Sequence, residues 1–236
     1  MERQLSQLVE RLKGAYQDRL VGVILYGSAA AGDHHARFSD LNVLCVLREI
    51  SPRELEEAGP IFRWWRKLGN PAPLLLSAEE ARNSTDCFPI EFQDIQECRR
   101  VLYGEDVVAE AEIDRSFYRA QVEHELRAKL LRLRQKAAGV LADKDLLRGL
   151  LVDSVSTFCV LFRHALRLAG HGTPVSKREV LRQAQEKFGL EPAPFLKVLE
   201  LREGKIKPRA LDPRALFADY LRAIEVVVGV VDRLEK

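Results

Sequence analysis

The chain has 236 residues, a length that suits one large domain or two of modest size. Hydrophobic residues make up 47% and charged residues 31%, which excludes a disordered, collagen-like or low-complexity protein. The 37 lysines and arginines against 35 aspartates and glutamates give a net charge of +2, too balanced to indicate a nucleic-acid or membrane-surface protein by charge alone.

Cysteine usage and the N-terminal segment indicate the compartment. The cysteines are widely spaced and form no C-x-x-C motif; they are Cys45, Cys87, Cys98 and Cys159. The first residues are amphipathic and carry acids among their bases, without the apolar stretch of a signal peptide, and no window reaches the roughly 18 apolar residues of a membrane span. We therefore expect a cytoplasmic protein with reduced, mostly buried thiols and no membrane partner.

The first half of the chain alternates helical and strand patterns. Residues 2–19 repeat apolar side chains at helical spacing and run into VGVILYG, a β-branched strand pattern that Gly27 closes. A polar loop leads to a second strand over 40–47, and Ser51-Pro52 opens a helix that extends to about Leu68.

Two further strands complete this pattern. PLLLS at 73–77 predicts a third strand and is followed by a short acidic helix. FPIEFQDI at 88–95 predicts a fourth strand. Strands that alternate with helices indicate an α/β sheet, and we assign residues 1–110 to this domain.

The second half of the chain is helical. Beyond Tyr103-Gly104 the strand patterns stop, and residues 111–236 contain long helical patterns separated by glycine and proline. Residues 149–169 are apolar nearly all round, which predicts the buried central helix of an all-α helical bundle.

The stretch LYGSAAAGDHHARFSDLNVLCVL carries the chemistry. A strand ends at Gly27-Ser28, and the next strand starts twelve residues after Ser28 with Asp40-Leu41-Asn42. Because side chains alternate along a strand, Asp40 and Asn42 project from one face and converge on the Gly-Ser turn. Glycine admits a phosphate close to the backbone, hydroxyl and amide groups donate to its oxygens, and a carboxylate holds Mg²⁺. The pattern predicts a site for a nucleoside triphosphate with Mg²⁺.

At Gly27, Ser28 and Asp40 the chain resembles the nucleotidyltransferase superfamily with its minimal and aminoglycoside-modifying members, over residues 20–105. The resemblance implies a mixed sheet flanked by helices and a following helical bundle. It also implies transfer of a nucleoside monophosphate to an acceptor, with release of pyrophosphate. By resemblance Gly27 and Ser28 bind the nucleotide, Asp40 and Glu91 are catalytic, and Asp40, Asn42 and Glu91 hold the metal.

Two positions depart from the family pattern or leave an alternative. Asn42 stands where the family has a second aspartate; its amide oxygen can coordinate Mg²⁺ but brings no negative charge. For the third carboxylate Glu91 is the candidate and Asp94 the alternative. On a strand the two would point to opposite faces, so only one of them could face the metal.

Two functions follow as hypotheses. The first is an enzyme that transfers AMP from a Mg²⁺-bound nucleoside triphosphate to a hydroxyl acceptor, whose identity the sequence does not indicate. The second is a catalytically weakened or inactive nucleotide-binding module, antitoxin-like, that forms a homodimer or binds a protein partner through its helical domain. A nucleic-acid partner is not favoured, because the charges of RAKLLRLRQK are typical of a solvated helix face, although facing a cleft they could bind phosphate.

Overall fold

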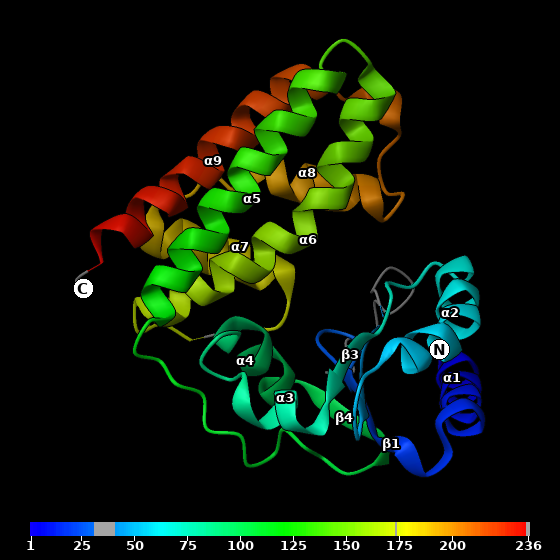
Figure 1. Cartoon of the computed structure of the whole chain (residues 1–236). Helices are drawn as coiled ribbons and strands as arrows, with labels where there is room; N and C mark the ends of the chain where they lie inside the picture. Colours follow the sequence, from blue (N-terminus) through cyan, green and yellow to red (C-terminus); the bar gives the residue numbers. More distant parts are fainter. Residues whose placement is uncertain (31–40, 173, 235–236) are drawn as a thin grey trace. The chain divides into compact units, whose positions relative to one another are not determined.

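The computed structural model describes residues 1–30, 41–172 and 174–234 (Figure 1). The chain divides into two compact units, Met1–Ser116 and Phe117–Lys236. Within the described residues, the first unit holds a sheet with helices and the second holds helices without strands.

The sheet of the first unit is mixed, as the resemblance implied. Its strands are β1 (Leu20–Tyr26), β2 (Asn42–Leu47), β3 (Leu74–Ser77) and β4 (Arg99–Gly104). Their order is β3-β2-β1-β4; β1 runs antiparallel to both β2 and β4, and β2 runs parallel to β3. The two central strands are therefore the ones that flank the Gly-Ser turn in sequence.

Helices cover both faces of this sheet (Figure 1). They are α1 (Glu2–Tyr16), the 3-10 turn η1 (Gln17–Arg19), α2 (Pro52–Lys67), α3 (Ala78–Asn83) and α4 (Pro89–Glu97). Val23 and Leu25 of β1 point into a core with α1 and α2, whereas Ile24 between them joins a core with α3 and α4. This alternation is the physical consequence of the two-residue repeat of a strand.

The predicted strand over 88–95 is wrong. The segment forms helix α4, and the fourth strand is β4, which follows it. Pro89 occupies the first turn of α4, where its missing amide hydrogen costs no hydrogen bond. Phe88, Ile90 and Phe92 alternate as in a strand, whereas Phe88, Phe92 and Ile95 have a helical spacing, and a run this short does not separate the two by periodicity.

The start of α2 is tied to the start of the sheet through a buried carboxylate. Ser51 and Glu54 form a capping box, in which the Ser51 amide donates to Glu54 Oε2 at 3.1 Å. Glu54 is only 2% exposed, and Arg19 of η1 donates to its carboxylate and to that of Glu57. The Ser51 hydroxyl also donates to Glu54 Oε2, and this hydrogen bond, with that from Arg19, lowers the pKa of Glu54 to about 2 against the opposing effect of burial.

Replacing Glu54 by Gln should destabilise the protein in a pH-dependent way. Because the folded pKa lies below the ordinary 4.5, the ionised carboxylate stabilises the fold above that pH and loses its contribution as the pH falls towards 2. Urea unfolding should therefore show the largest difference from the wild type at pH 7 and a smaller one at pH 3. The exposed Glu56→Gln is the control; a Glu54→Gln penalty that stays constant with pH would contradict the assignment.

The second unit is a bundle around one central helix. Its elements are α5 (Tyr118–Val140), α6 (Lys144–Leu168), α7 (Lys177–Phe188), α8 (Ala193–Arg202), the 3-10 turn η2 (Pro208–Ala210) and α9 (Pro213–Arg233). Helix α6 contacts each of the other four α-helices, which confirms the predicted buried central helix. Aromatic rings fill the core beside it, and the rings of Phe195 and Tyr220 stack with their centroids 4.1 Å apart.

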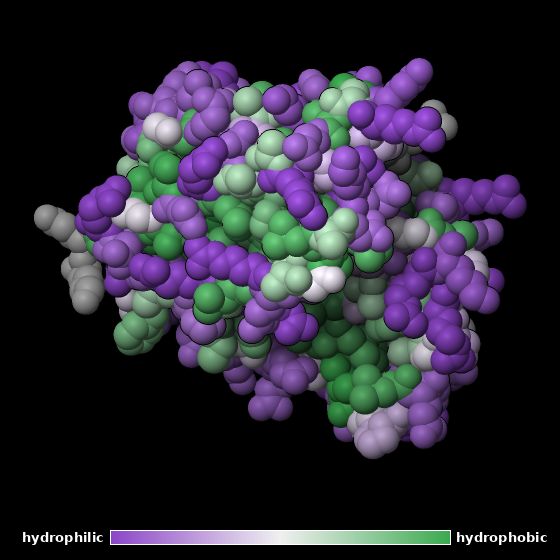
Figure 2. Space-filling view, turned by 90° about the horizontal axis from the view of Figure 1, so that it is seen from above, coloured by the Kyte–Doolittle hydropathy of each residue, from purple (hydrophilic) through white to green (hydrophobic). Residues whose placement is uncertain are grey.

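The surface is that of a highly charged chain. Figure 2 shows hydrophilic residues over most of the face it presents, with hydrophobic residues gathered near its centre. None of the described helices combines the length with the apolar character that a membrane span requires. Cys45 and Cys159, which the sequence places in apolar runs, are buried, and burial raises the pKa of both thiols to about 12.

Candidate functional site

The turn after β1 has a backbone conformation that favours glycine. Gly27 has a φ of +77°, in the left-handed region that strains any residue with a Cβ atom. Its amide donates to the Cys98 carbonyl at 2.8 Å, and its own carbonyl accepts from the Ala30 amide at 2.9 Å. Ser28 follows, half-buried, within the turn. The turn is thereby attached to Cys98, the residue that directly follows α4.

Asn42 lies against this turn. In the antiparallel pairing of β1 with β2, Tyr26 is the register partner of Asn42, so the end of β1 meets the start of β2. A Cβ atom added to Gly27 would stand 3.3 Å from Asn42 Nδ2. The side-chain amide of Asn42 therefore lies beside the glycine backbone, half-buried.

Asp40 lies outside the described residues, in the segment 31–40. Its expected position on the same strand face as Asn42 stays a prediction from the alternation of strand side chains.

Glu91 and Asp94 share one side of a helix. Since the segment is α4 and not a strand, their spacing of three residues places them on one face, and the expectation of opposite faces is wrong. Glu91 is exposed and Asp94 half-buried. Both carboxylates act on Tyr26, whose pKa is raised to about 12 by burial first, then by Asp94 and then by Glu91.

An electrostatic effect and a backbone hydrogen bond link α4 to the end of β1. Tyr26 precedes Gly27 directly, and Gly27 is hydrogen-bonded to the end of α4. Strand β3, the other neighbour of β2, carries no acidic residue. Tyr26 was not predicted as part of the site, although its place immediately before the Gly-Ser pair could have indicated it.

The described part of the chain contains no group of three histidine, cysteine, aspartate or glutamate side chains placed to hold one metal ion. That set of residues does not include Asp40. The side-chain amide of Asn42 lies beside the turn, and the carboxylates of Glu91 and Asp94 act on Tyr26, which precedes it. Amide and carboxylate oxygens are the ligand type that Mg²⁺ takes.

Comparison with known proteins identifies the fold. No family model matches the chain, and no curated protein sequence matches it. Among solved structures it is similar to spectinomycin adenyltransferase AAD(9) from Enterococcus faecialis, determined with ATP and spectinomycin. The TM-score is 0.63 at 12% identity, over 99% of this chain and 100% of that one. The chain has the nucleotidyltransferase fold. At this identity the likeness with AAD(9) concerns the fold, a mixed four-stranded sheet with helices followed by a helical region.

Gly27→Ala should lower the free energy of unfolding by about 1–2 kcal/mol, the usual cost of a left-handed backbone for a residue with a Cβ. Gly69→Ala is the matched control, because Gly69 has a φ of +89° with nothing within 4 Å of an added Cβ. Both variants should lose stability in urea, but only Gly27→Ala should shift the side-chain amide resonance of Asn42. An unchanged Asn42 resonance would show that the two residues do not touch.

Asp94→Asn should lower the pKa of Tyr26 from about 12, and by more than Glu91→Gln does, because Asp94 contributes the larger electrostatic effect. Burial remains in both variants, so the pKa should stay above the ordinary 10.0. NMR titration of ring-labelled tyrosines measures this directly. An equal Tyr26 pKa in the wild type and in Asp94→Asn would contradict the placement of α4 beside the end of β1.

Proposed function

We propose that the chain binds a nucleoside triphosphate with Mg²⁺ at the turn after β1 and transfers the nucleoside monophosphate to a hydroxyl acceptor, with ATP as donor. The observation that carries this proposal is the left-handed Gly27 turn held between Asn42 and the end of α4. It occurs in a chain that shares its fold with an adenyltransferase.

The turn supplies the phosphate contacts in this proposal. Gly27 has no side chain, so phosphate oxygens can approach the backbone, and the Ser28 hydroxyl can donate to them. Hydrogen-bond donors fixed by the fold stabilise negative charge without reorganising during the reaction.

The carboxylates of α4 supply the proton acceptor. Glu91 is the more exposed of the two and accepts the proton of the acceptor hydroxyl, while Asp94 stays beside Tyr26. The hydroxyl oxygen forms a bond to the α-phosphorus, and the bond from that phosphorus to the pyrophosphate oxygen breaks. The products are a nucleoside monophosphate ester and pyrophosphate, with the proton on Glu91.

The oxygen donors present fit Mg²⁺. Asp40, Asn42 and Glu91 would hold the ion, which when bound neutralises the charge of the triphosphate. An amide at Asn42 in place of a carboxylate keeps an oxygen donor but lowers the negative charge available to a cation.

This substitution favours a second candidate function, nucleotide binding without transfer. Asn42 brings no charge to the turn, and β3 beside it brings no acid. In this alternative the nucleotide is a ligand, and the helical unit binds a protein partner or a second copy of the chain.

Calorimetry with ATP, GTP, CTP and UTP, each with and without Mg²⁺, tests the binding step. Asn42→Asp should strengthen Mg²⁺-dependent binding and Asp40→Asn should weaken it, each by about tenfold or more. The exposed Asn83→Asp makes the same chemical change elsewhere in the first unit and should leave binding unaltered. No binding of any of the four nucleotides would overturn both candidate functions.

Pyrophosphate release separates the two candidates. Spectinomycin is the first acceptor to test, because the structural relative was determined with it. Release that needs an acceptor and is lost in Glu91→Gln supports transfer, whereas Mg²⁺-dependent binding without release over a panel of hydroxyl acceptors supports the second candidate.

A further inference from the structure

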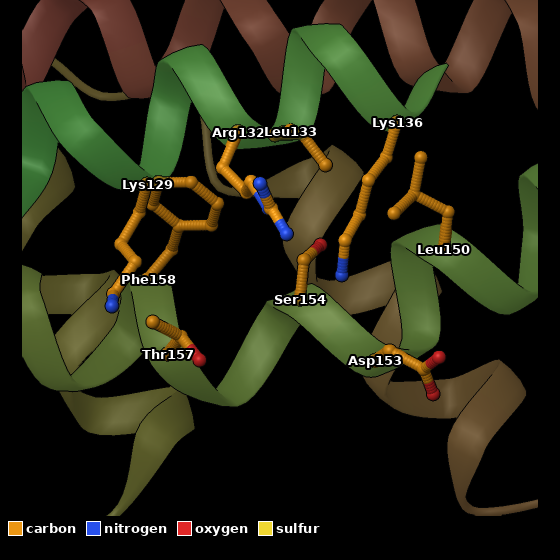
Figure 3. Close-up of a pocket in the computed structure, with 9 residues that line it drawn as sticks. All are labelled: Lys129, Arg132, Leu133, Lys136, Leu150, Asp153, Ser154, Thr157 and Phe158. Carbon is orange, nitrogen blue, oxygen red and sulfur yellow. The ribbon is translucent and has the colours of Figure 1, made fainter. Parts of the chain in front are cut away.

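A small cavity lies between α5 and α6 in the helical unit (Figure 3). Its volume is about 140 Å³, well below the roughly 300–1,000 Å³ of sites that enclose a whole small molecule. A cavity of this size takes one compact group rather than a nucleotide.

The α5 side of the cavity is cationic. Lys129, Arg132 and Lys136 line it from successive turns of the helix, and Figure 3 shows Arg132 and Lys136 extending towards Ser154 of α6. Like charges at this spacing on one helix repel each other unless an anion lies between them. The one acid in the lining, Asp153, is exposed, and its carboxylate points away from Ser154.

The other cations of α5 show that pairing is the rule on this helix. Towards α9, Arg127 pairs with Asp232 at 3.1 Å and Arg134 pairs with Glu225. Lys129 pairs with Glu125 along α5 at 3.2 Å.

Arg132 and Lys136 differ from these cations. Within residues 1–30, 41–172 and 174–234, neither has a carboxylate at ion-pair distance. The cations of α5 that face α9 are thus paired with acids. In the cavity between α5 and α6, by contrast, positive charges outnumber negative ones.

The α6 side of the cavity is lined by Leu150, Asp153, Ser154, Thr157 and Phe158. Ser154 Oγ is already occupied, since it donates to the Leu151 carbonyl at 3.0 Å and contacts the Tyr220 hydroxyl at 3.1 Å. Thr157 is exposed, and its hydroxyl has no hydrogen-bond partner within the described residues. Phe158, which is buried, is among the apolar residues that line the cavity.

We propose that this cavity binds a phosphate-sized dianion, with Arg132 and Lys136, which both extend towards Ser154, as its charge partners. Guanidinium and ammonium groups that converge on one point suit a phosphate, which accepts several charge-assisted hydrogen bonds. The ligand is free inorganic phosphate or the phosphate group of a small monoester. The proposal uses residues of the helical unit alone and does not depend on the transferase reaction.

Titration of the ¹⁵N-labelled full chain with inorganic phosphate, at ionic strength held constant with chloride, tests the site. The amide resonances of Ser154 and Thr157 should shift and saturate. Arg132→Gln combined with Lys136→Gln should weaken binding by about tenfold or more, because two charge-assisted contacts are lost. Arg134→Gln removes one positive charge from the same helix, two residues from Arg132 and outside the cavity, and should change the affinity by less than about twofold.

Both substituted side chains are exposed, and glutamine is a good helix former, so the double variant should keep its fold; an unchanged melting temperature checks this. Glycerol phosphate in place of inorganic phosphate distinguishes the two sources, since tighter binding of the monoester indicates an organic phosphate and equal or weaker binding indicates the free ion. Shifts that do not saturate, or equal affinities in the double variant and the wild type, would overturn the proposal. So would binding of a short single-stranded RNA that the double variant loses while no phosphate titration saturates.

Discussion

The antiparallel pairing of β1 with β2 is the constraint on which the candidate site depends. Its register sets Tyr26 opposite Asn42, so the turn that closes β1 and the residues that open β2 occupy the same edge of the sheet. A register slip of one residue would turn every side chain of β2 to the other face. The apolar cores on both faces oppose such a slip, because Val43 and Leu44 pack on different helices. The core thus holds Asn42 beside Gly27.

Helix α4 brings negative charge to this edge. Its end is attached to the turn by the bond from the Gly27 amide to the Cys98 carbonyl, and its carboxylates act on the Tyr26 hydroxyl. A helix can present Glu91 and Asp94 together, which a strand cannot. The concentration of negative charge at this edge therefore depends on a helical backbone, in addition to the presence of the acids in the sequence. At the same edge Asn42 is a neutral amide, so the negative charge comes from α4 and not from β2.

In the helical unit most of the charges on α5 are paired with charges of opposite sign. The cations of α5 that face α9 have acids opposite them, and this pairing links the two helices at their surface. Exposed pairs of this kind stabilise a fold little, so the packing of α6 against its neighbours carries most of the stability. The cavity beside Arg132 and Lys136 is distinctive because most other cations of the same helix are paired.

The sequence by itself determined the sheet with its following helices, three of the four strands, the central helix of the bundle, and the Gly-Ser turn with Asn42. These features depend on local periodicity or on a glycine that closes a strand, which neighbouring residues specify.

Tertiary structure decided the rest. In the segment 88–95 the apolar residues match a strand at some positions and a helix at others. Packing of Phe92 and Ile95 against the sheet selects the helix. That choice places Glu91 and Asp94 on one face. The cavity between α5 and α6 likewise arises from two segments that meet only when the bundle is packed, so no local pattern encodes it.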